Sequence, residues 1–312
     1  MAQETVEISS STSLNTVEIE SLRKTVDDRL EEYFYVDGAE SRLMCAVRHG
    51  LLSPGKRIRP LMTILACRQS GGQDATALSA ACAVEMVHAA SLVMDDLPSM
   101  DDARLRRGGL ATHIVFGEGP ATLAAIALLN ESYRIISTDN SISAEAKIRS
   151  INHLTKAIGI DGLAGGQEHD IACGKFVPSN SVSLKEMEQR HFAKTGALFA
   201  AAAAIGGEIA GASEETVEKL SEYGCSLGLA YQAFDDVIDV SCTESETGKD
   251  SCQDQEKSTV VSLLGADGAR RLAERHLTQA IECAQSVSII DTSPLAELAQ
   301  LVGAKFGSMT DQ

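Results

Sequence analysis

The stretch DATALSAACAVEMVHAASLVMDDLPSMDD, residues 74–102, decides the fold. It begins as a long apolar run and ends in the carboxylates of Asp95, Asp96, Asp101 and Asp102. A run of this length, rich in Ala, favours a buried core helix over a strand. Such a helix delivers negative charge to one place at its C-terminal end.

A second stretch, SEETVEKLSEYGCSLGLAYQAFDDVIDV at residues 213–240, also ends in carboxylates. Asp235 and Asp239 stand four residues apart and share one helix face. In the first stretch, Asp101 would point about 140° away from Asp96 on an unbroken helix. Pro98 disfavours further helix and lets the chain fold back. We therefore expect two acidic helix ends that could face each other.

The composition favours helices packed on helices. Of the 312 residues, 44% are hydrophobic, none is Trp and only 6 are Pro, which favours an all-α fold. Residues 1–15 are expected to be disordered, and no repeat or linker divides the rest, so residues 16–312 are predicted to form one domain. Amphipathic segments lie near 17–36, 39–52, 58–70, 74–96, 119–137, 143–160, 162–173, 183–211, 213–240, 257–264, 266–287 and 293–306.

Charge and cysteine usage exclude several classes of protein. A formal net charge of -17 argues against nucleic-acid binding, which needs a basic surface. The 8 cysteines form no CxxC pair, which is typical of a reducing, cytoplasmic setting. No apolar run reaches the roughly 18 residues of a membrane span, so we expect no stable membrane insertion.

The two acidic clusters predict a magnesium site. Carboxylates at a helix C-terminus oppose the helix dipole and repel one another, so two such clusters need a counter-charge. Mg²⁺ takes oxygen ligands and is commonly shared with substrate phosphates. The alternative is that the carboxylates are merely solvated helix ends.

Several basic residues lie in the sequence near these acidic ends. Each alone could be a solvated surface cation. His88 precedes Asp95 by seven residues and so lies on nearly the same helix face. It is either a core histidine or a donor to a phosphate oxygen. The other basic positions are Lys56, Arg57, Arg59, Arg106, Arg107, Lys194, Lys249 and Lys257.

Taken in order over residues 40–265, these motifs resemble the trans-isoprenyl diphosphate synthases, and most of all the geranylgeranyl diphosphate synthases. The matching motifs are Gly55-Lys56-Arg57-Ile58-Arg59-Pro60, His88, Asp95-Asp96 with Asp101, Arg106-Arg107, Gly165-Gly166-Gln167, Lys194-Thr195, Gln232, Asp235-Asp236-Val237-Ile238-Asp239 and Lys257-Ser258-Thr259.

The resemblance implies a homodimer of single-domain helical subunits, each with a deep cavity, that binds isopentenyl diphosphate and an allylic diphosphate. It assigns three Mg²⁺ ions to Asp95, Asp96, Asp101 and Asp235, with Asp236 and Asp239 in support. It assigns the allylic diphosphate to Arg106, Lys194, Thr195, Gln232, Lys249 and Lys257. It assigns isopentenyl diphosphate to Lys56, Arg59, His88 and Arg107.

The reaction implied is ionisation of the allylic C–O bond, attack of the isopentenyl double bond on the resulting cation, and loss of a proton to the released pyrophosphate. Ala90 stands five residues before Asp95, where farnesyl-specific relatives place an aromatic ring. Val87 and Met86 lie one turn deeper and would then stop the growing chain. The expected product is geranylgeranyl diphosphate, with farnesyl diphosphate the alternative, unless Ala90 only permits close helix packing.

Two other functions compete with this interpretation. A class I terpene cyclase also ionises a diphosphate, but it needs no second diphosphate site. A non-catalytic regulatory subunit of a heteromeric synthase would typically lose the acidic motifs, which are intact here. The chain departs from the family pattern at Ile126, where relatives commonly have an acid, and in the Ser-, Cys- and acid-rich stretch 241–256.

Overall fold

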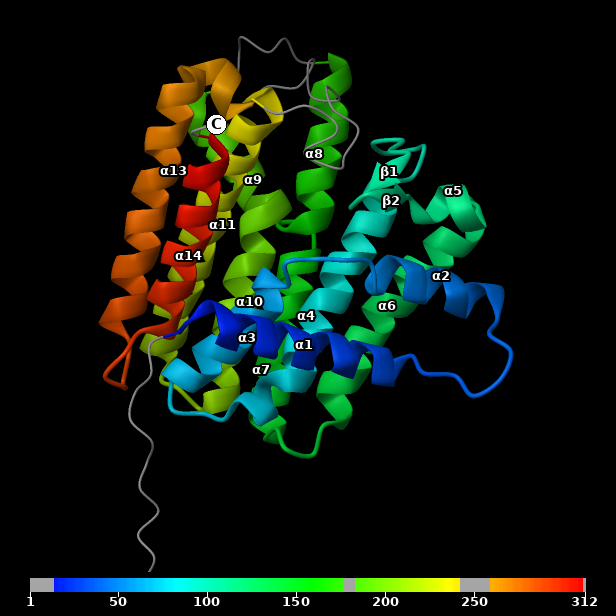
Figure 1. The fold of residues 1–312 in the computed structure, drawn as a ribbon, viewed down its shortest axis with the longest axis horizontal. Helices are drawn as coiled ribbons and strands as arrows, with labels where there is room; N and C mark the ends of the chain where they lie inside the picture. The colour runs from blue at the N-terminus through cyan, green and yellow to red at the C-terminus, as the bar shows by residue number, and fades with distance from the viewer. Residues whose placement is uncertain (1–13, 177–182, 242–258, 311–312) are drawn as a thin grey trace, which may run out of the picture.

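The computed structural model describes residues 14–176, 183–241 and 259–310. They form a bundle of helices with one short hairpin (Figure 1), which confirms the all-α prediction. The helices are α1 Thr16–Tyr33, α2 Arg42–Leu51, α3 Ile58–Gln69, α4 Asp74–Asp95, α5 Thr112–Phe116, α6 Glu118–Thr138, α7 Ala144–Ile158, α8 Leu163–Phe176, α9 Leu184–His191, η2 Phe192–Gly196, α10 Ala197–Ala210, α11 Glu214–Ser241, α13 Val260–Ser286 and α14 Pro294–Thr310.

Polar side chains fix where several helices begin. Asn15, Ser41, Ser143 and Ser183 each accept a hydrogen bond from a backbone N–H three residues further on, which satisfies a donor that the first helical turn leaves unpaired. The predicted break near residue 265 is present as Gly265, whose φ of 72° interrupts α13. The amphipathic pattern and the polar capping residues therefore place the helices to within a few residues.

Several sequence predictions fall on residues that the structure does not describe. Most of the expected disordered start lies at residues 1–13. Leu14 and Asn15 are described, and the Leu14 N–H donates to Glu297 on α14 at 2.5 Å. Lys249, Lys257 and the stretch 242–256 lie outside the described residues, and the same holds for the side chain of Asp239.

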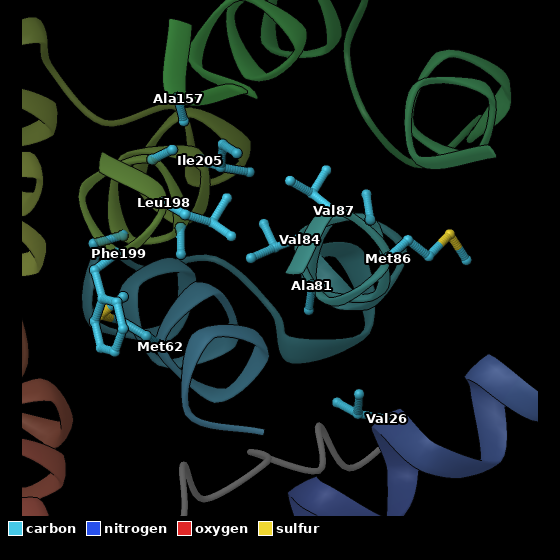
Figure 2. Close-up of a cluster of buried hydrophobic side chains, with 14 of the residues drawn as sticks. Val26, Met62, Ala81, Val84, Met86, Val87, Ala157, Leu198, Phe199 and Ile205 are labelled. Carbon is cyan, nitrogen blue, oxygen red and sulfur yellow. The ribbon is translucent and has the colours of Figure 1, made fainter. Parts of the chain in front are cut away.

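Helix α4 runs through the middle of the bundle and is buried along most of its length. Figure 2 shows its side chains facing those of α10, with Val84 directed toward Leu198. Small residues let the neighbouring helices approach closely: a Cβ on Gly206 of α10 would lie 2.3 Å from the Thr63 carbonyl oxygen of α3. Thr63 also donates its hydroxyl to the Ala202 carbonyl at 3.0 Å. The core is thus close-packed between α3, α4 and α10.

The apolar helices are core helices. Both α4 and the Leu184–Ala210 segment are long and apolar enough to cross a membrane by composition alone. In each, 78% of the most apolar window is buried within the protein. Packing against neighbouring helices therefore accounts for their hydropathy.

Three local elements were not predicted from the sequence: the short helix α5, a hairpin and a π-helical turn. Strands β1 (Leu105–Arg106) and β2 (Gly109–Leu110) pair as an antiparallel hairpin after the first acidic cluster. Its turn residues, Arg107 and Gly108, have φ values of 54° and 79°, as a two-residue hairpin turn requires. The π-helical turn is η2, which lies between α9 and α10 in one continuous helical segment.

The close approach at Gly206 leads to a stability prediction. We expect Gly206→Ala to destabilise the fold by about 1–3 kcal/mol, because the new methyl group meets a backbone carbonyl that cannot move aside. Denaturant unfolding measures this change. Gly119→Ala is the matched control, since its Cβ would meet no atom within 4 Å, and it should be neutral or slightly stabilising. Equal stability of the two variants would contradict the packing described here.

Candidate active site

The chain reverses direction immediately after α4. Asp96 caps the helix, and the Asp101 N–H donates to the Asp95 carbonyl at 2.9 Å. Asp102 and Met100 both donate their N–H groups to the Leu97 carbonyl, at 3.1 and 2.8 Å. The fold-back expected from Pro98 is therefore present. It returns Asp101 to the neighbourhood of Asp95.

Lys194 lies between two carboxylates from different helices. Its Nζ donates to Asp170 Oδ2 of α8 at 2.7 Å and lies 3.8 Å from Asp95 Oδ2 of α4. Burial alone would lower the pKa of Lys194, but the charges of Asp95 and Asp170 outweigh it and raise this pKa above its ordinary value. The ammonium is therefore a fixed positive charge at the end of α4.

Asp95 is itself strongly perturbed. Burial raises its pKa to about 6, the Lys194 charge opposes this shift, and the nearby Asp101 charge adds to it. A carboxylate that is desolvated beside a second carboxylate favours a bound cation, because a cation would restore the charged form. The end of α4 therefore has the electrostatics of a cation site.

The π-helical turn η2 presents Lys194 and Thr195. Its wider backbone needs a small neighbour, and Gly166 of α8 provides one: a Cβ there would lie 2.7 Å from the Lys194 backbone nitrogen. Single π-helical turns are frequent at functional sites. The sequence motif Gly165-Gly166-Gln167 thus has a structural reason in the close approach of α8 to η2.

A chain of hydrogen bonds links this turn to the second acidic cluster. Thr195 Oγ1 donates to Gln232 Oε1 at 2.9 Å, and Gln232 Nε2 donates to Asp236 Oδ1 at 3.0 Å. Asp236 Oδ2 accepts the N–H of Val260, at the start of α13, at 3.0 Å. Asp236 is buried and connects helices, which agrees with a supporting role. The two acidic helix ends therefore meet through adjacent residues, Lys194 and Thr195.

Arg106 and Arg107 point to different partners. Arg106 Nε donates to Asp96 Oδ1 at 2.8 Å, and its Nη2 contacts the same oxygen. Arg107 Nη2 lies 3.3 Å from His88 Nε2. The hairpin separates the two guanidinium groups, so the first faces the acidic cluster and the second faces His88. Asp96 is thus engaged by Arg106, and Asp95 lies near Lys194.

Arg59 and Arg107, two of the residues expected to bind isopentenyl diphosphate, converge on a third, the imidazole of His88. Arg59 Nη1 and Arg107 Nη2 each lie 3.3 Å from His88 Nε2. Burial and the surrounding arginines lower the pKa of His88 well below its ordinary value, so Nε2 accepts from the two guanidinium groups. The predicted donation from His88 to a phosphate oxygen would then fall to Nδ1.

The cations around His88 are short of counter-charge. Burial lowers the pKa of Arg59 to about 10 and also lowers the pKa of Arg107. Arg59 Nε is buried and has no hydrogen-bond partner among the described residues. A buried donor without a partner together with surplus positive charge is the signature of an anion site.

Lys56, the fourth expected residue, lies on an aromatic cluster. Its Nζ is 5.0 Å from the ring centre of Phe306 on α14 and 5.5 Å from that of Tyr231 on α11. Its Nζ also lies 3.5 Å from the Tyr231 hydroxyl. Phe234 stacks on Phe306 at 4.9 Å. Aromatic side chains of α11 and α14 thus hold the Lys56 ammonium.

Within the described residues, no group of three or more His, Cys, Asp or Glu side chains is arranged so that it could hold a metal ion by itself. Asp235 lies partly buried on α11, one residue before Asp236. Sequence reasoning did not find Asp170, although it stands four residues after Gly166 and so on the same helix face. It also did not assign roles to Glu85 and Arg57.

The fold and site together define a class of protein. An all-α core brings two acidic helix ends and a lysine to one place, and a separate group of arginines surrounds His88 of the same central helix. The first group is suited to a metal-bound anion and the second to an anion held by the protein alone. This arrangement is that of a diphosphate-handling transferase.

Comparison with known proteins supports that class. Residues 40–291 match the family model described as polyprenyl synthetase. The chain is 43% identical over 264 residues to geranylgeranyl pyrophosphate synthase 12, chloroplastic, of Arabidopsis thaliana, covering 83% of this chain and 73% of that protein. It is 38% identical over 283 residues to geranylgeranyl pyrophosphate synthase 10, mitochondrial, of the same plant, covering 89% and 82%.

Solved structures agree with the fold. A putative farnesyl-diphosphate synthase from Marinomonas sp. MED121 superposes with a TM-score of 0.78 at 32% identity, over 93% of this chain and 99% of that one. A geranyltransferase from Helicobacter pylori complexed with magnesium and isoprenyl diphosphate gives a TM-score of 0.77 at 26% identity, over 96% and 100%. The chain belongs to the polyprenyl synthetase family and is a prenyltransferase.

The Lys194–Asp170 pair leads to a kinetic prediction. We expect Asp170→Asn to lower kcat about 10-fold or more and to raise the allylic KM, because Lys194 loses the charge that holds it in place. The isopentenyl KM should stay near its original value. Glu168→Gln is the matched control, since Glu168 is an exposed acid on the same helix and should have no effect. An Asp170→Asn variant with unchanged kcat would refute the positioning of Lys194 by Asp170.

Proposed function

We propose that this protein condenses isopentenyl diphosphate with allylic diphosphates and that its main product is geranylgeranyl diphosphate. The substrates of the reaction are dimethylallyl, geranyl and farnesyl diphosphate as successive allylic partners. The names of the relatives support the product, and the two anion sites of the structure support the reaction.

The observation that carries the proposal is that α4 contributes to two differently built sites, a group of arginines at His88 and an acidic cluster at Asp95. His88 and Asp95 are seven residues apart, which is about 10 Å along a helix, and both face the same side. The site at His88 places two arginines around a histidine, and the site at Asp95 combines carboxylates with Lys194. Two diphosphates could therefore bind at once, one with metal and one without.

The acidic site fits magnesium. Asp95 and Asp101 supply hard oxygen donors on one side of the chain reversal, and Asp235 of α11 follows the hydrogen-bonded Gln232 by three residues. These residues would hold Mg²⁺, with the allylic diphosphate completing the coordination. Bound Mg²⁺ would stabilise the negative charge that develops on the departing pyrophosphate. The expected number of three ions stays a prediction.

The residues of the chain then divide the work. Lys194, together with Thr195 and Gln232, would hold the allylic diphosphate while its C–O bond breaks and the electron pair leaves with pyrophosphate. Arg59, Arg107 and His88 would hold isopentenyl diphosphate so that its double bond forms the new C–C bond with the allylic cation. The proton lost from the product passes to pyrophosphate. The apolar side chains of the core keep water from the cation.

We also propose a homodimer. Apolar side chains are exposed along α5 and α6, namely Ile114, Val115, Leu123 and Ile126, at 40%, 43%, 54% and 56%. An exposed apolar strip of this kind suits a second copy of the chain. Ile126, where relatives commonly have an acid, adds to this strip. Light scattering of the purified protein tests the dimer.

The cytoplasmic location stays a prediction, which cell fractionation tests.

Turnover by the purified chain alone tests the function. We expect product from isopentenyl diphosphate with each allylic primer in the presence of Mg²⁺, and none after chelation by EDTA. Chromatography of the labelled product reads its length. A non-catalytic regulatory subunit would show no turnover without a partner. A terpene cyclase would consume an allylic diphosphate without incorporating isopentenyl diphosphate.

The side chains expected to limit the product all lie on α4. Ala90, Val87 and Met86 are buried, at 1%, 0% and 0% exposure. Consecutive residues of a helix project about 100° apart. Figure 2 shows Met86 directed away from α10, while Val87 projects in another direction. The two side chains therefore cannot close the same side of the helix.

We expect Ala90→Tyr to shift the main product from twenty carbons to fifteen, because a ring at this position shortens the space available to the growing chain by about one helical turn. Product chromatography measures the shift. Val87→Ala and Met86→Ala, tested singly, form a matched pair. The variant that lengthens the product identifies the side of α4 along which the chain grows. Unchanged product length in Ala90→Tyr would place the floor elsewhere.

A further inference from the structure

Arg57 differs from the other two cations of its turn. Its side chain is 2% exposed, as is that of Glu85 on α4. Its Nη1 donates to Glu85 Oε1 at 2.6 Å, and its Nε donates to Asp27 Oδ1 of α1 at 2.7 Å. Its Nη2 donates to the carbonyls of Ser53 and Leu51, at 3.0 and 3.3 Å. All three guanidinium nitrogens are thus occupied by the protein.

These contacts hold a strained turn. Arg57 has a φ of 50°, a left-handed conformation that non-glycine residues seldom adopt, and it directly precedes α3. Gly55, two residues earlier, lies between two guanidinium groups, since a Cβ there would lie 2.9 Å from Arg107 Nη1 and 3.0 Å from Arg57 Nη1. Ser53 accepts from both arginines through its carbonyl oxygen, at 3.0 Å from Arg57 and 3.4 Å from Arg107. The turn is therefore built around Arg57.

Glu85 connects this turn to His88. It stands three residues before His88 on α4, so the two side chains lie on neighbouring positions of one helix face. Its charge favours the protonated forms of Arg57, Arg59 and Arg107 and so raises their pKa values against the effect of burial. The other carboxylate on Arg57, Asp27, is 42% exposed. Glu85 is thus the buried counter-charge of the cationic group.

We propose that Arg57 and Glu85 are positioning residues for the isopentenyl diphosphate site. Neither touches the substrate. The buried pair fixes the turn of residues 53–57 against α4. The position of this turn then determines where Arg59 and Arg107 lie relative to His88. This inference rests on the proposed function, because it assigns the diphosphate of isopentenyl diphosphate to that group.

Positioning and simple electrostatics predict opposite results for Glu85→Gln. The substitution keeps the size of the side chain and removes a negative charge close to an anion site. If Glu85 only weakens the positive electrostatic potential at the anion site, the Glu85→Gln variant binds anions more tightly. If Glu85 positions the arginines, the variant binds anions more weakly, because Arg57 loses the buried carboxylate that fixes its turn against α4.

We expect Glu85→Gln to raise the isopentenyl KM about 10-fold or more while the allylic KM changes by less than about 3-fold. Asp27→Asn is the matched control, since it removes the exposed partner of the same guanidinium group and should have a small effect. An isopentenyl KM that is unchanged or lowered in Glu85→Gln would overturn the proposal.

Two further measurements distinguish loss of folding from loss of function. The double variant Arg57→Met with Glu85→Leu replaces the buried ion pair by apolar groups, which often preserves stability, and thermal unfolding shows whether it is folded. A folded double variant with an original isopentenyl KM would refute positioning. Binding of inorganic pyrophosphate in metal-free buffer, measured by calorimetry, tests the site without turnover. Weaker binding by Glu85→Gln than by the original chain supports the proposal even if the proposed reaction fails, and equal or tighter binding overturns it.

Discussion

Two buried helices end in carboxylates at the same place, and this electrostatically unfavourable arrangement organises the rest of the molecule. Asp95 and Asp96 stand at the C-terminal end of α4, where the helix dipole already places partial negative charge. Lys194 lies between Asp95 and Asp170, and Arg106 engages Asp96. Each carboxylate at the end of α4 therefore has its own cation. The π-helical turn, the hairpin and the close approach of α8 all serve to bring those cations there.

Helix α4 also couples the acidic site to the cationic one. Glu85 lies about one turn before His88 and Asp95 about two turns after it on the same helix, so their spacing is set by helix geometry. Because α4 is closely packed against its neighbours, a displacement at one end is transmitted along the helix with little deformation. Small residues determine that packing, since Gly206 lets α10 approach α3 to a distance that no side chain would permit. The separation of the two anion sites thus depends on the same contacts that stabilise the core.

Much of the fold could be predicted because long apolar periods and polar caps are local signals. The fold-back at Pro98 and the two acidic helix ends followed from the same reasoning. The hairpin could not be predicted, because Arg107 adopts a positive φ that its residue type disfavours. The π-helical turn has no composition of its own. Asp170 gained its role only through a helix that packs against η2, which is tertiary information.

The turn at residues 55–60 shows most clearly what burial adds to a sequence motif. Lys56, Arg57 and Arg59 stand within four residues of one another, and nothing in their chemistry distinguishes which cation serves a ligand. Arg57 is saturated by carboxylates and carbonyl groups, whereas Arg59 keeps a buried nitrogen without a partner among the described residues. A protein with a net charge of -17 can therefore hold a local positive field, because the buried carboxylate of Glu85 pairs with Arg57 and leaves the charges of Arg59 and Arg107 without a carboxylate partner among the described residues.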